Sequence, residues 1–78
     1  MALKISVTPA GDGWAVRSSE FENELMFQAG AKAEAAARDL ARRVAASGVP
    51  AQVDIFLRDG ALAGRFHHPA LAMEAVSA

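Results

Sequence analysis

The fold is decided by residues 29–47, which read AGAKAEAAARDLARRVAAS. At about 100° per residue, the apolar side chains fall on one arc of a helix and the charged side chains on the other. The apolar arc holds Ala33, Ala36, Ala37, Leu40, Ala41 and Val44. The charged arc holds Glu34, Arg38, Asp39, Arg42 and Arg43. This pattern predicts an amphipathic helix, and Gly48 followed by Pro50 predicts its end. Because most of the apolar arc is alanine, we expect the helix to lie close against a sheet.

Working back toward the N-terminus, residues 3–8 alternate between apolar and polar side chains, with Leu3, Ile5 and Val7 as the apolar members. A period of two predicts a strand with one buried face. Pro9 has no N–H to donate to a sheet ladder, so we expect the strand to end there.

Residues 10–13 read AGDG and predict a tight turn in which the glycines supply positive φ angles. A second strand then begins at once, with Trp14 and Val16 on one face. The polar residues 18–23 predict a loop, and residues 25–27 predict a short third strand whose first and last side chains face inward.

Beyond the helix, residues 53–58 alternate again, with apolar side chains at 53, 55 and 57. Asp-Gly at 59–60 predicts a two-residue hairpin loop, and residues 61–66 predict the returning strand. Residues 69–76 are compatible with a short helix or with a mobile tail.

The element order is therefore strand, strand, short strand, helix, strand, strand. It predicts an α+β fold in which one main helix covers one face of an antiparallel sheet of four to five strands. We expect a single domain over residues 1–68, followed by a tail or short helix over residues 69–78.

Composition restricts the class of protein further. The chain has 78 residues, a net charge of −1 and no cysteine, so it has room for one domain and carries no disulfide or thiolate chemistry. No apolar run approaches the length of a membrane span, and the N-terminus lacks the layout of a signal peptide. We therefore expect a cytoplasmic protein.

Three segments together resemble a known family. They are residues 7–16 (VTPAGDGWAV), Phe27 followed by residues 31–41 (AKAEAAARDLA), and residues 58–60 (RDG). In this order they are similar to the small bacterial domain-of-unknown-function family 2188, over roughly residues 3–64. Gln28 and Ala29 stand where members usually carry a capping pair. The resemblance implies the fold and a bacterial cytoplasmic origin, and it assigns no catalytic residue because the family has no established activity.

The side chains that carry chemistry in other proteins are sparse here. His67 and His68 are adjacent, so in a strand they point to opposite faces and do not chelate one ion together. No serine or threonine lies in a glycine-flanked nucleophile elbow. No helix follows the glycines at 11 and 13, so they do not form a phosphate loop. We expect no catalytic residue, no metal site, no cofactor and no small-molecule substrate.

Two non-enzymatic functions remain. A nucleic-acid-binding or antitoxin-like regulatory module would use the basic helix face, chiefly Arg38, Arg42 and Arg43. The helix carries four bases and two acids, a local charge of +2, but the slightly acidic chain as a whole disfavours phosphate binding.

The function that we favour is a small interaction module that binds another protein, most simply a second copy of itself as a homodimer. Of 41 hydrophobic residues 19 are alanine, so the core is thin and a partner surface would add burial. Phe56 faces away from the helix if residues 53, 55 and 57 face it, and we expect it to be at least half buried. The candidate contact residues are Phe56, Leu71, Met73 and Trp14. Contact could be made through the uncovered sheet face, a sheet edge or the C-terminal segment.

Overall fold

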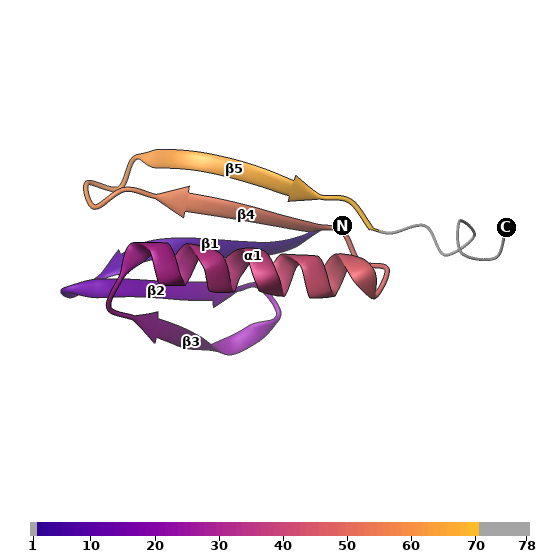
Figure 1. The fold of residues 1–78 in the computed structure, drawn as a ribbon, viewed down its shortest axis with the longest axis horizontal. Helices are drawn as coiled ribbons and strands as arrows, with labels where there is room; N and C mark the ends of the chain where they lie inside the picture. Colours follow the sequence, from indigo (N-terminus) through magenta and orange to yellow (C-terminus); the bar gives the residue numbers. More distant parts are fainter. Residues whose placement is uncertain (1, 71–78) are drawn as a thin grey trace, which may run out of the picture.

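The computed structural model describes residues 2–70, which form one five-stranded sheet and one helix (Figure 1). The elements in chain order are β1 (Leu3–Ala10), β2 (Gly13–Ser18), β3 (Phe21–Phe27), α1 (Gly30–Ala46), β4 (Ala51–Phe56) and β5 (Leu62–His68). The strands lie side by side in the order β3-β2-β1-β4-β5. The expected α+β class and the single main helix are confirmed.

The sheet is mixed rather than antiparallel, because β1 and β4 pair in parallel. The cause is the path of the chain. β2 is antiparallel to both β1 and β3, so β1 and β3 run in the same direction. α1 then carries the chain back along the sheet, and β4 begins at the same end as β1, with Leu3 opposite Ala51. A helical crossover of this kind joins parallel strands, so the prediction of a fully antiparallel sheet was wrong for this pair.

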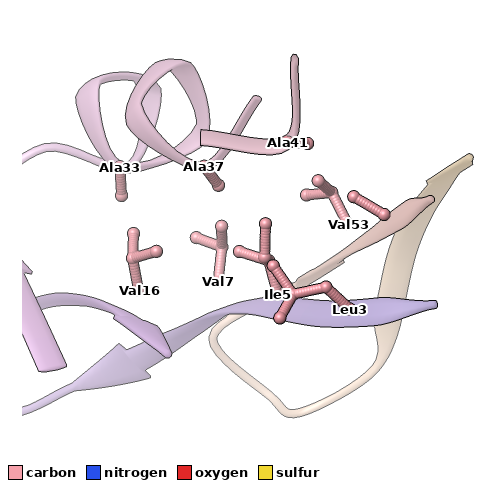
Figure 2. Close-up of a cluster of buried hydrophobic side chains, with 9 residues drawn as sticks. Leu3, Ile5, Val7, Val16, Ala33, Ala37, Ala41 and Val53 are labelled. Carbon is pink, nitrogen blue, oxygen red and sulfur yellow. The ribbon is translucent and has the colours of Figure 1, made fainter. Parts of the chain in front are cut away.

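The core lies between α1 and one face of the sheet. Ala33, Ala37 and Ala41 are fully buried and point toward the strands, as Figure 2 shows. They meet larger side chains from β1, β2 and β4, namely Leu3, Ile5, Val7, Val16 and Val53. The small helical side chains let the helix approach the sheet closely, as the sequence pattern indicates, and the strands supply the volume.

Both ends of α1 follow from local sequence. Ala29 occupies the N-cap position with extended backbone and makes no side-chain cap hydrogen bond. At the other end, Gly48 has φ +100° and its N–H donates to the Ala45 carbonyl over 3.0 Å. The Val49 N–H donates to the Val44 carbonyl over 3.1 Å. These two bonds form a Schellman motif, which satisfies the last carbonyls of the helix.

The strands before the helix are longer than expected. β1 continues through Pro9 to Ala10, because the β1–β4 ladder already ends at Val7 and the missing N–H removes no bond from it. β3 begins at Phe21, so the loop predicted over residues 18–23 was wrong after residue 20. β3 is an edge strand, and edge strands carry the charged side chains that resemble a loop in sequence.

The two glycines of the first turn act differently from each other. Gly11 alone has positive φ, +58°, which fits a type II′ hairpin turn. Gly13 does not have positive φ; a Cβ there would collide with the Phe27 carbonyl oxygen, so glycine lets β3 approach.

The second hairpin has a three-residue loop over residues 58–60 instead of the expected two-residue loop. The Leu57 N–H donates to the Ala61 carbonyl over 2.8 Å, and Gly60 has φ +92°. This is a type I turn followed by a glycine bulge. β5 continues through His68, two residues beyond the expected strand. The short helix or tail expected over residues 69–78 lies outside the described residues from residue 71 onward.

Candidate functional site

The face of the sheet opposite α1 is left open within residues 2–70, whose only helix is α1. Successive side chains in a strand point to opposite faces. Ile5, Val7 and Val53 point to the helix, so their neighbours in the strands point to the uncovered face. The register of the sheet arranges these neighbours in rows that run across the strands, two of which are described below.

The first row, which we call the charged row, crosses all five strands. It consists of Arg65 on β5, Asp54 on β4, Ser6 on β1, Arg17 on β2 and Glu24 on β3. Arg65 Nε lies 2.8 Å from Asp54 Oδ1, and Arg17 Nη2 lies 2.9 Å from Glu24 Oε1. The row therefore holds two ion pairs on either side of the central strand.

Asp54 is the most constrained member of the charged row, since 14% of its side chain is exposed. The Arg65 guanidinium holds the pKa of Asp54 below its usual value, opposed by burial and helped by the Gln52 amide. Asp54 in turn raises the pKa of Arg65. Both groups are ionised at neutral pH, so the signs of these two charges are fixed.

The second row, which we call the apolar row, lies one step along the strands. It consists of Leu62 on β5, Phe56 on β4, Thr8 on β1, Ala15 on β2 and Met26 on β3. Leu62 and Met26 at its ends are 46% and 59% exposed. Ala15 has no exposed surface, although it points away from the helix, so larger neighbours close over it. The exposed apolar side chains of the row therefore lie toward its ends and not at Ala15.

The structure places the two described contact residues expected from the sequence on different sides of the sheet. Phe56 is partly buried in the apolar row. Trp14 lies on the helix side, where a Cβ on Gly30 would be 3.1 Å from its Cε2 atom and Arg58 stacks 4.8 Å from its ring centroid. Leu71 and Met73 lie outside the described residues. Phe56 and Trp14 therefore do not share a surface.

The basic helix face is largely engaged within the chain. The Arg38 guanidinium stacks 3.9 Å from the centroid of the Phe66 ring. Arg42 and Arg43 both contact Asp39, at 3.2 Å and 2.8 Å. Arg38 therefore belongs to the packing between α1 and β5, and one carboxylate partly neutralises the other two arginines.

A groove of about 820 Å³ lies where β1 begins and α1 ends. Its lining comprises Ala2, Leu3, Lys4, Ser19, Glu20, Val44, Ser47 and Val49. The Ser47 hydroxyl donates to the Val44 carbonyl over 2.7 Å, and the Ser19 hydroxyl accepts from the Lys4 backbone N–H. Both groove hydroxyls therefore form hydrogen bonds with backbone groups.

Residues 2–70 contain no group of three or more His, Asp or Glu side chains placed to hold a metal ion. Within the same residues, no helix is both long and apolar enough to cross a membrane. Comparisons with family models, curated proteins and solved structures gave no match to the chain.

The charged row was missed in the sequence. Arg17 and Glu24 flank the segment that was assigned to a loop, so their pairing across a hairpin was not considered. Asp54 and Arg65 pair only in the register set by the three-residue loop and the bulge between Ile55 and Phe56. The available signal was their alternation with the apolar residues of β4 and β5.

Proposed function

We propose that this protein is a small, non-enzymatic cytoplasmic interaction module that binds a second copy of itself through the uncovered face of the sheet. The observation that carries the proposal is the apolar row. Its ends at Leu62 and Met26 are about half exposed, and Phe56 lies between them on a face that α1 does not cover. Exposed apolar side chains on an open sheet face are a feature of interaction surfaces.

The thin core supports the same proposal. The buried hydrophobic residues among those described are six alanines and only five larger side chains, none of them aromatic. A chain of this size buries a small share of its surface and is marginally stable alone. Association would stabilise the folded state by mass action.

The test is the absolute mass in solution, measured by light scattering over a hundredfold range of concentration. We expect a shift from 8.2 kDa toward twice that value as the concentration rises. Met26→Asp should abolish the shift, because Met26 points to the uncovered face. Leu25→Asp is the matched control: Leu25 is adjacent, similarly exposed at 53%, and pairs with Val16 on the helix side.

Phe56→Asp should also keep the chain at 8.2 kDa, with its fold checked by circular dichroism. A wild-type mass of 8.2 kDa at every concentration would contradict the proposal. Equal effects of Met26→Asp and Leu25→Asp would place contact at the edge of β3 instead of the face.

The alternative of a nucleic-acid-binding or antitoxin-like module has less support, because Arg38 is occupied by Phe66 and Asp39 contacts both Arg42 and Arg43. It predicts salt-sensitive retention on DNA or RNA that is lost in the Arg42→Ala/Arg43→Ala variant. Our proposal predicts no such retention and no change of mass in that variant.

A further inference from the structure

The charges of the charged row reverse about the central strand. From β5 to β3, the charged row reads Arg65, Asp54, Ser6, Arg17 and Glu24, which is plus, minus, neutral, plus, minus. Arg65, two strands to one side of β1, is positive, and Glu24, two strands to the other side, is negative. Asp54 and Arg17, each one strand away from β1, are likewise opposite in sign. A row with this property is complementary to its own copy after rotation about β1.

We propose that two copies of this chain pack sheet face against sheet face about a two-fold axis parallel to β1. This inference rests on the proposed function and specifies its geometry. The rotation places Arg65 of one copy against Glu24 of the other and Asp54 against Arg17, while Ser6 meets its own equivalent. Each intrachain ion pair then lies antiparallel to a partner pair, which makes two four-charge networks.

The other two-fold axis in the plane between the two sheets would place like charges of the charged row against each other. An axis perpendicular to the strands along the charged row would set Arg65 against Arg65 and Asp54 against Asp54. Like charges facing each other across an interface are costly. The axis along β1 gives four opposite-charge contacts and sets one like pair, Lys4 and its own copy, against each other, so the charges favour this axis over the other.

The apolar row fits the same rotation. Leu62 meets Met26, so the two most exposed ends of the row cover each other. Phe56 faces the position of Ala15, which presents no exposed side chain, and Thr8 meets its equivalent on the axis. Stacked sheets lie about 10 Å apart.

The size of the face predicts a weak, reversible dimer. The five strands span about 24 Å across, and their paired length is about 20 Å, from the usual strand spacing and rise. The flat contact is therefore roughly 1,000 Å² in total, at the low end for specific interfaces. Association should fall in the micromolar range and weaken at high salt, because the charged row is part of the contact.

The experiment uses two variants that each reverse one ion pair and keep it intact within the chain. One is Asp54→Arg/Arg65→Glu and the other is Arg17→Glu/Glu24→Arg. In each variant the row becomes symmetric about β1, so like charges face each other in a homodimer. When the two variants are mixed, every facing position is again opposite in sign.

We expect each variant alone to stay monomeric at concentrations where the wild type dimerises, and a one-to-one mixture to form a heterodimer. Native mass spectrometry with one variant labelled with ¹⁵N distinguishes the species, and circular dichroism checks both folds. Continued homodimerisation of either variant would overturn this geometry, as would loss of dimers that mixing does not restore. A wild type that never dimerises would instead refute the proposed function.

Discussion

Arg38 distinguishes two hypotheses for the basic helix face: that its arginines stabilise the fold, or that they bind nucleic acid. Its guanidinium stacks on Phe66, its Nε lies 3.5 Å from Glu34 Oε2, and 37% of its side chain is exposed. Arg43, five residues further along α1, is 78% exposed and forms an ion pair with Asp39. We therefore expect Arg38→Ala to destabilise the fold much more than Arg43→Ala.

The magnitude follows from the contacts that are lost. A cation–π contact at a partly exposed site contributes about 1 kcal/mol, and an i,i+4 ion pair about 0.4 kcal/mol. Half-burial of the two further methylenes of the stem adds about 1 kcal/mol. Arg38 Nε is buried without a hydrogen bond among the described residues. Removing this unsatisfied group is favourable, so it reduces the expected loss of stability. We expect a loss of about 1.5–2 kcal/mol, against about 0.4 kcal/mol or less for Arg43→Ala.

The assay is urea unfolding followed by the fluorescence of Trp14, the single tryptophan, at a concentration too low for association. A double-mutant cycle with Phe66→Leu should give a coupling of about 1 kcal/mol between the two side chains. The reasoning is refuted if Arg38→Ala costs no more than Arg43→Ala, or if the coupling is zero.

Three further changes test other parts of the structure. Gly13→Ala should cost about 2 kcal/mol or more in urea unfolding, because its Cβ would collide with the Phe27 carbonyl oxygen; a cost near zero would contradict the close approach of β3. Ile5→Ala should cost about 3 kcal/mol, since three buried carbons at about 0.8 kcal/mol each are removed and a cavity remains. The Arg65 contact lowers the pKa of Asp54, so this stabilisation is present near neutral pH and is lost as the pH falls through the folded-state value. The Asp54→Asn variant should therefore be less stable than the wild type at pH 7, and it should lose less stability than the wild type between about pH 5 and pH 2. An equal loss in the two proteins over that range would contradict the prediction.

The helix could be predicted from the sequence because its signals are local. The alanine stripe needs only the period of the helix, and Gly48 marks the end through its own φ angle. The lack of a cap at Ala29 was also visible in the residue type alone.

The direction of β4 and the extent of β3 could not be predicted in the same way, since they depend on partners far along the chain. β3 carries Glu22 and Glu24 because one of its sides faces solvent, so its pattern resembles a loop. The charged row is still harder to predict from the sequence, because its members come together only when all five strands are in register. The orientation of Phe56 away from the helix could therefore be predicted from the sequence, whereas the charges of that face came from the structure.

The parallel pairing of β1 with β4 also sets an order for synthesis on the ribosome. β1 is made first but lies at the centre of the sheet, and its partner β4 follows only after the whole of α1. Until β4 emerges, one edge of β1 has unpaired backbone groups, and until α1 emerges the apolar side of Leu3, Ile5 and Val7 has no cover. Nascent chains that stop before residue 51 therefore expose an apolar strand edge, which is the form most prone to aggregation and most open to chaperone binding.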